Sequence, residues 1–443
     1  MSTSTNVGGK IPRQVWKTAL LGGMASYLDG AVLVTAGIAF SLTIDSLGLS
    51  AWDIGLLSGL LTGLLAVGAL VGGRLGDKFG RRRVLTLDLL VFVVGLALIT
   101  GAVNVPMLYA GVVLTGLAMG ADLPVSISLV AESAPVQHRG RLVAFSQILW
   151  GLGPSVALVL NVVFSAAGLS DDLQARLLWA HVLVVAVVVW AARRRLPESD
   201  EWLAATRSAA DSTDVAVGET GTVDVAKLKL LVPYTLPLVG VGLFYTVGNF
   251  SPNTGGQFSF FILTQVAHLP VATVANIMLT IAPLALFLGV VFIKVVDTRL
   301  RYPAMLAAGV LGAFAWAIPG IFGLTSTTYL IAFYGALIAS GFIGEGLYKV
   351  RTQEIFPPLV RSTAQGATIF VCRMGAAGLA VVTPAVASAD LGGLLWLLCG
   401  FNVLTLLFGV WIMRIPSAPT QATAVPAATG TSPTVTGAAA APL

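Results

Sequence analysis

Charged residues are scarce in this sequence: Asp, Glu, Lys and Arg make up only 10% of its 443 residues, whereas hydrophobic residues make up 56%. Together with a mean hydropathy of +0.91, this scarcity excludes an ordinary water-soluble domain, in which about a quarter of the residues are charged. Cysteine is nearly absent too. Because Cys372 and Cys399 both lie inside apolar runs, a disulfide framework is excluded as the basis of the fold.

The sequence also lacks the residue sets of common catalytic sites. It has three histidines and no nucleotide-binding loop, metal-ligand cluster or Ser-His-Asp set, so we expect no enzyme activity, cofactor or metal. The net charge of +5 does not indicate nucleic-acid binding, because the basic residues are spread between the apolar runs. Residues 1–17 hold no separate apolar segment, so no cleavable signal peptide is expected.

The hydrophobic residues gather in twelve runs of about 20 residues or longer, which as helices can cross a hydrocarbon core roughly 30 Å thick. The runs are, approximately, 17–41, 54–76, 84–103, 106–133, 142–167, 173–193, 232–263, 271–295, 303–322, 327–352, 361–388 and 391–414. The sequence therefore predicts an all-α membrane protein with twelve transmembrane helices in the lipid bilayer.

The basic residues lie almost entirely on one side of this predicted membrane. They precede the first run, follow the last, and fill the connections after the even-numbered runs, as in the stretch 73–83. The opposite connections carry Asp45, Asp53, Asp171, Asp172 and Asp390, with Arg176 as the one basic exception. The positive-inside rule then predicts a multi-pass protein of the cell membrane with both termini in the cytoplasm.

Two motifs occur twice along the chain. Glu-x-x-Pro-x-x-x-Arg begins at Glu132 and again at Glu354, 222 positions later. Asp77 of "GRLGDKFGRRR" has a degraded counterpart 220 positions later, Asp297 of "KVVDTRLRYP". Two independent markers with nearly the same spacing indicate two six-helix halves. Parallel repeats of this kind are related by an axis along the membrane normal and hold a solute site near the midplane.

The composition between and after the halves sets the expected domain boundaries. A polar stretch, "SAADSTDVAVGETGTVD", separates the sixth and seventh runs and is typical of a flexible or partly helical linker. The C-terminal tail is rich in Pro, Ala, Thr and Gly and has nothing to bury. We expect a bundle at 1–205, a cytoplasmic linker at 206–231, a second bundle at 232–415 and a disordered cytoplasmic tail at 416–443.

The stretch "GRLGDKFGRRR" (73–83) resembles the Gly-x-Leu-x-Asp-Arg/Lys-x-Gly-Arg-Arg signature of the major facilitator superfamily. We expect Asp77 to cap the N-terminal end of the following helix, and Gly80 to allow the tight turn before it. The resemblance covers roughly residues 15–415. It implies two pseudo-symmetric bundles and transport of a small molecule by alternating access.

Shorter stretches resemble particular branches of this superfamily. "RLPESDEWL" (195–203) and "EIFPPLVR" (354–361) are similar to sugar-porter sequences, and Gln147 matches a sugar-binding glutamine of their fifth helix. "GADLPV" (120–125) resembles a segment of the phosphate, aromatic-acid and related metabolite:proton symporters. The resemblance therefore points to a sugar porter or a metabolite:proton symporter.

Three charged residues stand near the middle of predicted spans: Asp29, Asp122 and Arg373. Since an ionised side chain at mid-bilayer costs about 2.5–3.5 kcal/mol, such residues face partners or a water-filled cavity. Asp29 matches the first-helix acid that the family often uses for proton coupling, and Asp122 is a second candidate or an orienting partner. Arg373 either binds an anionic solute or forms a structural ion pair with an acid.

Several polar residues of the predicted spans could contact the solute. Glu345 and Lys349 are four positions apart, so they form a self-neutralising pair, or Glu345 lines the cavity instead. The substrate-binding candidates are Gln147, Trp150, Asn249, Asn253, Gln257, Glu345 and Arg373, with Tyr245 as an apolar platform. Arg373 favours an anion, whereas Gln147 favours a sugar or polyol.

The resemblance also implies a gate at the cytoplasmic face. Charge pairs there bridge the two bundles while the protein is open to the outside, and they separate when it opens inward. The predicted gating residues are Asp77, Arg81, Glu132, Arg139, Glu354 and Arg361. They are not expected to contact the solute.

These observations favour a proton-coupled symporter, expected to act as a monomer, that imports a small polar metabolite such as a sugar, polyol or organic acid. The alternative is a proton-driven efflux antiporter of amphipathic compounds, because "GLGPSVA" (151–157) partly resembles the Gly-Pro motif of exporters. A third alternative is a membrane sensor that binds a ligand without transporting it.

Overall fold

The computed structural model describes residues 11–211, 230–261, 263, 270, 273–274, 277 and 280–418. Within these ranges the chain is helical and contains no strand. Its main helices are α1 (Arg13–Leu42), α2 (Ile44–Leu47), α3 (Ala51–Phe79), α4 (Arg81–Thr100), α5 (Val105–Ser133), α6 (Arg139–Ala166), α7 (Asp171–Arg193), α8 (Asp200–Asp211), α10 (Thr235–Phe261), α12 (Ile281–Val295), α13 (Arg301–Phe322), α14 (Ser326–Ile343), α15 (Glu345–Ile355), α16 (Arg361–Ala389) and α17 (Leu391–Arg414).

The predicted membrane spans correspond to these helices. Among the described residues, nine helices are long and apolar enough to cross a membrane, and Ile281–Val295 is a shorter apolar helix. Each of the twelve apolar runs of the sequence overlaps a helix or, for the run at 327–352, the pair α14 and α15. The all-α membrane fold is thereby confirmed.

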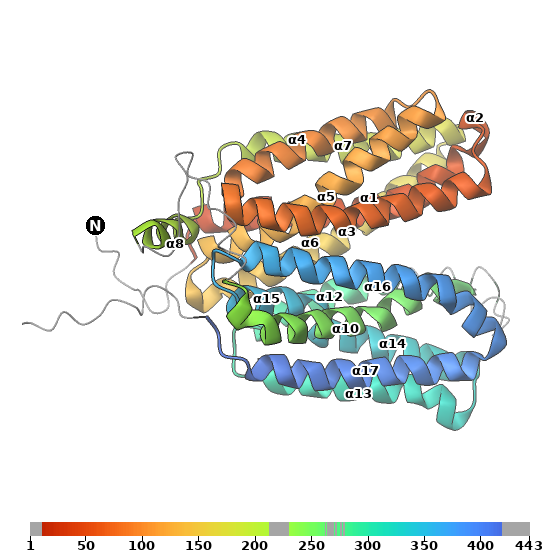
Figure 1. Cartoon of the computed structure of the whole chain (residues 1–443). Coiled ribbons are helices and arrows are strands. Elements are labelled where there is room, and N and C mark those ends of the chain that lie inside the picture. The colour runs from red at the N-terminus through yellow and green to blue at the C-terminus, as the bar shows by residue number, and fades with distance from the viewer. Residues whose placement is uncertain are drawn as a thin grey trace, which may run out of the picture.

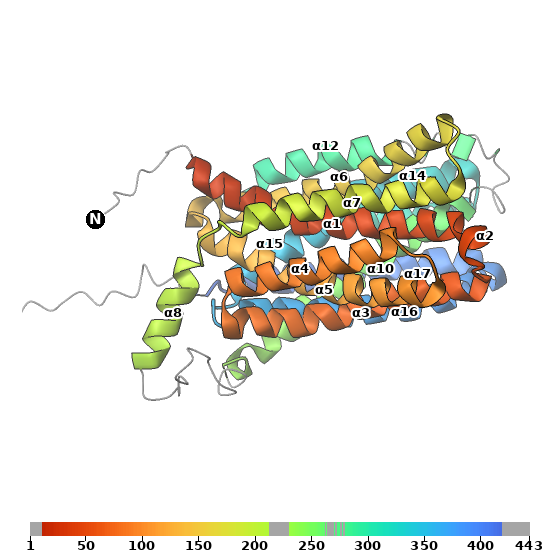
Figure 2. The ribbon, with the colours of Figure 1, turned by 90° about the horizontal axis from the view of Figure 1, so that it is seen from above.

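The helices form two bundles that lie side by side (Figure 1). The first contains α1 and α3 to α7, and the second contains α10 and α12 to α17. The bundles meet where α3 packs against α16 and where α6 packs against α12 and α15. We call the end that carries the 73–83 turn the basic end. There α8 lies across the ends of the bundle helices (Figure 2).

Two glycines let α3 and α16 touch backbone to backbone near the basic end. A Cβ atom at Gly73 would lie 2.2 Å from the carbonyl oxygen of Ser362, and one at Gly366 would lie 2.1 Å from that of Ala69. Real Cβ atoms do not approach a backbone oxygen so closely, so a larger residue would push the helices apart. This crossing brings the 73–83 turn against the first residues of α16.

The tenth predicted span is not continuous. The run 327–352 is divided at Gly344, whose φ of −97° and ψ of −149° end α14 and begin α15. Non-helical backbone is tolerated at membrane depth only where protein or a cavity surrounds it. The break makes Glu345 the first residue of a new helix inside the second bundle.

The predicted linker is partly helical, because α8 continues to Asp211, beyond the expected end of the first bundle at 205. The rest of the linker, 212–229, and the tail 419–443 lie outside the described residues. The last described stretch, 416–418, folds back on the second bundle, where the Ala418 N–H donates to the Glu354 carbonyl oxygen.

Candidate functional site

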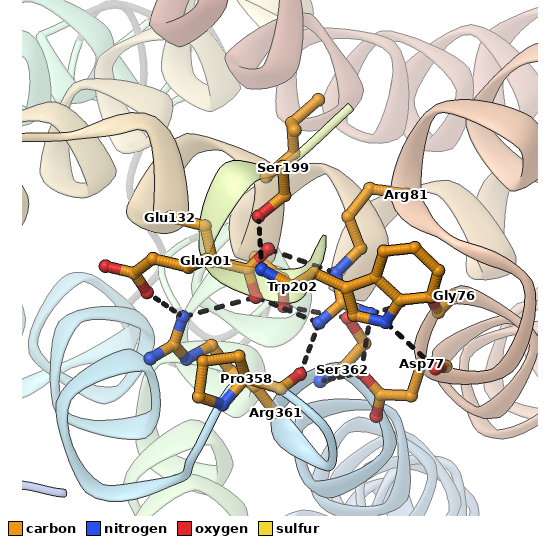
Figure 3. A network of polar contacts seen from close by, with 12 residues as sticks. Gly76, Asp77, Arg81, Glu132, Ser199, Glu201, Trp202, Pro358, Arg361 and Ser362 are labelled. Atoms are coloured by element: carbon orange, nitrogen blue, oxygen red, sulfur yellow. Dashed lines mark hydrogen bonds and ion pairs between the residues drawn. The ribbon is translucent and has the colours of Figure 1, made fainter. Parts of the chain in front are cut away.

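A fully buried arginine, Arg81, organises the basic end (Figure 3). Its Nη1 donates to the Gly76 carbonyl oxygen at 2.6 Å and to Asp77 at 2.7 Å. Its Nη2 and Nε donate to the two oxygens of Glu132 at 2.9 and 3.2 Å. Nη2 also reaches the second bundle, where it donates to the Pro358 carbonyl oxygen at 2.5 Å. A bidentate, buried pair of this kind fixes both side chains.

Glu132 extends these contacts across the boundary between the bundles (Figure 3). Arg361 Nη1, from the second bundle, lies 3.2 Å from Glu132 and 3.2 Å from Glu201 of α8. Arg139 pairs with the other oxygen of Glu201. Arginines and glutamates thus alternate in one chain, which we call the basic-end network: Arg81, Glu132, Arg361, Glu201 and Arg139. It holds the two bundles together at this end.

Asp77 does not cap the helix that follows it, so that prediction is wrong. Its carboxylate instead accepts from the N–H groups of Thr363 at 2.7 Å and Ser362 at 3.3 Å, at the start of α16 in the other bundle. Asp77 lies within α3, one half-turn before Phe79, on the side that the Gly73 crossing brings to α16. A carboxylate at a helix N-terminus is favourable because it meets unpaired N–H groups and the positive dipole end.

The role predicted for Asp77 belongs to Glu198. This residue of the stretch 195–203 accepts from the N–H of Arg81 at 2.9 Å and from that of Arg82 at 3.1 Å, the first residues of α4. In the same stretch, the Trp202 indole donates to the Asp77 carbonyl oxygen at 3.1 Å. The resemblance of the stretch 195–203 to sugar porters includes Glu198. The sequence does not, however, indicate which groups Glu198 contacts. Gly80, with φ +95°, makes the expected tight turn.

The second bundle repeats the arrangement around Asp77. Asp297 accepts at 2.7 Å from the N–H of Arg141, the third residue of α6 in the first bundle. Thr363 likewise is the third residue of α16. Each bundle therefore supplies an acid to the N-terminus of a helix in the other. Asp297 lies in the connection between spans, where burial raises its pKa although the Arg141 N–H and nearby arginines act in the opposite direction.

Glu354 is the counterpart of Glu132 but does not bridge the bundles. It pairs with Arg301 at 2.7 Å and with Arg351 at 2.5 Å, both in its own bundle. The pair with Arg301 repeats the Arg81–Glu132 pair. The expectation that both glutamates bridge the bundles is therefore right for Glu132 and wrong for Glu354. Arg361, the cation of the second bundle that crosses the boundary, pairs with Glu132 and Glu201 instead.

Two of the three predicted intramembrane charges come together between the bundles. Asp29 lies about halfway along α1 and is 1% exposed. Its Oδ2 accepts from the Trp150 indole at 2.9 Å and lies 3.6 Å from Arg373 Nη2 of the second bundle. Gly30 lets α1 approach α6 here, since a Cβ atom would lie 2.7 Å from the Trp150 carbonyl oxygen. Arg373 therefore pairs with an acid in this structure.

Asp122, the third predicted intramembrane charge, lies elsewhere. It is buried inside the first bundle, where Arg193 Nη1 contacts it at 2.6 Å and Ser126 donates to it at 2.5 Å. Arg193, the last residue of the predicted run 173–193, is only 1% exposed and also donates to the Leu21 carbonyl oxygen on α1. Sequence reasoning also missed Asp88, a buried acid within electrostatic reach of Asp122. Asp88 could have been found in the sequence, because it is a single acid within the apolar run 84–103.

The predicted Glu345–Lys349 pair forms, at 2.8 Å. Lys349 is buried and its Nζ also crosses to the first bundle, where it lies 3.2 Å from Gln147 Oε1 and 3.4 Å from Ser26 Oγ. Gln147, like Trp150, thus already has a partner within the protein. We call the five residues that meet here, Asp29, Trp150, Glu345, Lys349 and Arg373, the central cluster.

The remaining predicted candidates lie on α10. Asn253 donates to Asn249 at 3.4 Å, which is long for a hydrogen bond. Gln257 belongs to α10, but its side chain lies outside those that the structure describes. Tyr245 is 3% exposed and stacks on Tyr348 with ring centroids 3.7 Å apart. Within the described part of the chain its hydroxyl group has no hydrogen-bond partner.

Comparisons with known proteins agree with this architecture. The family model of the Major Facilitator Superfamily matches residues 19–380. The minor myo-inositol transporter IolF of Bacillus subtilis is 31% identical over 366 residues, or 81% of each chain. The major myo-inositol transporter IolT of the same organism is 24% identical over 89% of this chain and 90% of its own.

Solved structures show the same fold. The structure of the proton:xylose symporter XylE bound to 6-bromo-6-deoxy-D-glucose superimposes with a TM-score of 0.72 at 18% identity, covering 91% of this chain and 96% of XylE. A partially occluded inward-open form of XylE from E. coli superimposes with a TM-score of 0.63 at 19% identity, over 92% and 99% of the two chains. The chain is a membrane transporter, not an enzyme, and belongs to the major facilitator superfamily.

Proposed function

We propose that the protein is a proton-coupled symporter that imports a sugar or polyol across the cell membrane. Three findings support the proposal. The superfamily comprises membrane transporters, the relative that matches most of the chain at 31% identity is a myo-inositol transporter, and the fold is that of a proton:xylose symporter. Gln147, Asn249, Asn253 and Gln257 supply amide groups suited to hydroxyl groups of such a solute.

The observation that carries the proposal is the position of Asp29. It is a buried acid about halfway along α1, and it contacts the first bundle through Trp150 and the second through Arg373. A proton that binds there changes a contact between the bundles directly. Alternating access needs two conformations of similar free energy, and a single protonation then suffices to change their populations. Asp122 lacks this position, because it is enclosed in the first bundle.

The basic-end network acts as the inner gate in this proposal. Its pairs at Glu132 are buried, those at Glu201 are partly buried, and both connect across the boundary through Arg361. Opening toward the basic end must separate Arg361 from Glu132 and Glu201, and must withdraw Asp77 from the start of α16. None of these side chains belongs to the central cluster. The network therefore sets the balance between conformations and not the affinity for solute.

The basic end faces the cytoplasm in this proposal, which places both termini there, and the protein acts as a monomer. The positive-inside rule supports the orientation, since the connections at this end carry most of the Lys and Arg residues.

Uptake by purified protein in proteoliposomes tests the function. With an inward-directed proton gradient, we expect labelled myo-inositol, xylose or glucose to accumulate above its external concentration, and to stop accumulating when a protonophore dissipates the gradient. Expulsion of solute along this gradient would instead support the efflux antiporter. Ligand-induced stabilisation without flux would support the sensor. Nicotinate belongs in the same panel, because a niacin transporter of Acinetobacter baylyi is 36% identical over 85 residues, 19% of each chain, and Arg373 offers a cation.

A further inference from the structure

The central cluster contains two carboxylates and two cations, divided unequally between the bundles. Asp29 comes from the first bundle, whereas Glu345, Lys349 and Arg373 come from the second. With all four ionised the charges cancel. Since an unpaired charge at this depth costs several kcal/mol, any change in the charge of one member requires the others to find new partners.

Arg373 is the member with the weakest attachment. Its Nη2 is 3.6 Å from Asp29, longer than the 2.7–2.9 Å or so of a strong charge-assisted hydrogen bond. Its Nε is buried and has no hydrogen-bond partner among the described residues. Arg373 is also within electrostatic reach of Glu345. It therefore stands between an acid of the first bundle and an acid of its own.

Asp29 has a free position for a proton. The indole of Trp150 and Arg373 both approach Oδ2. The other oxygen, Oδ1, is buried and has no hydrogen-bond partner within the described ranges. A proton on Oδ1 would neutralise the carboxyl group without displacing Trp150. It would also remove the charge that holds Arg373.

Glu345 is the acid placed to receive Arg373. It begins α15, directly after the break at Gly344. Lys349 contacts it through Oε1 at 2.8 Å, but Lys349 is shared with Gln147 and Ser26 of the first bundle. A single carboxylate can accept two cations, as Glu354 does near the other end of α15 with Arg301 and Arg351.

We propose that Arg373 exchanges partners when Asp29 binds a proton, leaving Asp29 for Glu345. An ion pair between the bundles then becomes an ion pair within the second bundle. Glu345 acts as a positioning residue and not as a solute ligand. The inference rests on the proposed proton coupling at Asp29, and it explains how one proton would release the central contact between the bundles without leaving an unpaired arginine.

The other titratable and charged groups around the cluster, within the described ranges, come from three helices and one neighbouring ion pair. They are Tyr348 of α15, Cys372 of α16, Tyr245 of α10, and the Arg193–Asp122 pair, which contacts α1 two turns before Asp29. Glu345 is the acid that the second bundle contributes to this group. Its removal is therefore the change that tests the exchange.

The experiment measures the pH midpoint of solute counterflow in proteoliposomes without a pH gradient. If Arg373 can no longer move to Glu345, it stays with Asp29 and opposes its protonation. We expect Glu345→Gln to move the midpoint by about one pH unit or more toward acid. Glu345→Asp keeps the charge and should retain a midpoint close to that of the wild type. An unchanged midpoint in Glu345→Gln would overturn the proposal.

A double variant separates partner exchange from simple neutralisation of Lys349. In Glu345→Gln/Lys349→Gln the charges balance again, yet Asp29 is still the acid that Arg373 contacts. Partner exchange predicts that the acid shift persists. Return to the wild-type midpoint would show that Glu345 merely neutralises Lys349, and would refute the exchange. Because the pair is removed together, this variant leaves no lone buried charge and decides the question even where Glu345→Gln fails to fold.

A readout that needs no solute keeps this test separate from the test of function. Hydrogen–deuterium exchange of the start of α16, corrected for the intrinsic effect of pH, reports separation of the basic end. The same acid shift is expected there. If the wild type accumulates no sugar or polyol but its exchange profile shifts in Glu345→Gln, the proposed function fails and the partner exchange stands. If the wild type accumulates solute and neither midpoint shifts, the partner exchange alone fails.

Discussion

Arg361 Nη1 lies 3.2 Å from Glu132 and 3.2 Å from Glu201, so a single nitrogen of the second bundle joins an acid of the first bundle to an acid of α8. Glu132 is held in turn by Arg81 and Glu201 by Arg139. The crossing thus depends on few contacts, although most of their atoms are buried. Removing one of these contacts should therefore have a measurable effect on the closure of the basic end.

Glu132→Gln should loosen the basic end. It removes the negative charge shared by Arg81 and Arg361, and loss of one partner of a buried ion pair costs about 3–5 kcal/mol. Hydrogen–deuterium exchange at the start of α16 should rise, while solute affinity in a state-locked protein stays nearly unchanged. Glu354→Gln is the matched control, because its arginine partners lie within one bundle. It should lower the unfolding temperature without selectively opening this end. Equal opening in both variants would contradict the gate.

Gly73→Ala should also open the basic end, for a steric reason. The new methyl group would lie 2.2 Å from the Ser362 carbonyl oxygen, which cannot move without shifting α16. Gly59→Ala on the same helix is the control, since a Cβ atom there would have no neighbour within 4 Å among the described residues. Replacing a helical Gly by Ala gains up to about 1 kcal/mol. Accessibility of the basic end should increase in the first variant only. Equal accessibility of the basic end in the two variants would show that α3 and α16 are not in close contact at Gly73.

Asp297 makes closure of the basic end depend on pH. Its pKa is raised in the closed arrangement, so the neutral form is favoured there relative to an exposed aspartate with a pKa of about 3.9. Its contribution to closure is therefore complete below about 3.9, the pKa of an exposed aspartate, and is lost as pH rises through the raised pKa. Asp297→Asn should remove this dependence and, at neutral pH, retain or increase the unfolding temperature.

Asp77→Asn should change the unfolding temperature in the direction opposite to Asp297→Asn. Asp77 accepts from Thr363 but also pairs with Arg81, so its loss leaves a buried cation with less compensation. Hydrogen bonds to charged groups contribute about 1.5–3 kcal/mol each. We expect a lower unfolding temperature at neutral pH, opposite in direction to Asp297→Asn. Thermal unfolding followed from neutral toward acid pH measures both. A loss of stability at neutral pH in both variants would contradict the prediction for Asp297.

Asp29→Asn should separate transport from proton coupling. The amide imitates the protonated acid, so uphill accumulation and its pH dependence should be lost, whereas counterflow, which needs no net proton movement, should remain. Asp122→Asn should instead lower stability, because it leaves Arg193 without its carboxylate. Both variants are compared by uptake under an imposed pH gradient. If Asp29→Asn still concentrates solute, Asp29 is not the coupling residue and Asp122 takes its place as the candidate.

The fold was predictable because hydrophobicity determines it. Apolar runs long enough to span a bilayer give the helices, and the repeats at Asp77 and Asp297 give the two halves. The division of the tenth span was not predictable in this way. The residues around Gly344 are as apolar as their neighbours apart from Glu345, and a break at this depth depends on the helices that surround it.

The sequence predicted which residues belong to the candidate site better than it predicted which of them contact each other. Asp29, Arg373, Glu345 and Lys349 stand out as charges within apolar runs, and the structure brings them together. Their partners depend on side-chain direction and helix contacts that one sequence does not encode. Arg193 shows the difficulty: it ends an apolar run beside two further arginines, like a residue at the membrane surface, yet its guanidinium turns inward to Asp122.

The reciprocal placement of Asp77 and Asp297 means that neither bundle is chemically complete alone. Produced separately, the first would carry Asp77 without the α16 amides that it caps, and would leave the start of α6 without Asp297. A chimera of one bundle from this protein and one from a distant relative would form these contacts only if both acids and both helix N-termini were present at matching positions. A substitution at one of these positions therefore affects the other bundle as well. An engineered exchange of halves must keep both acids and both helix N-termini.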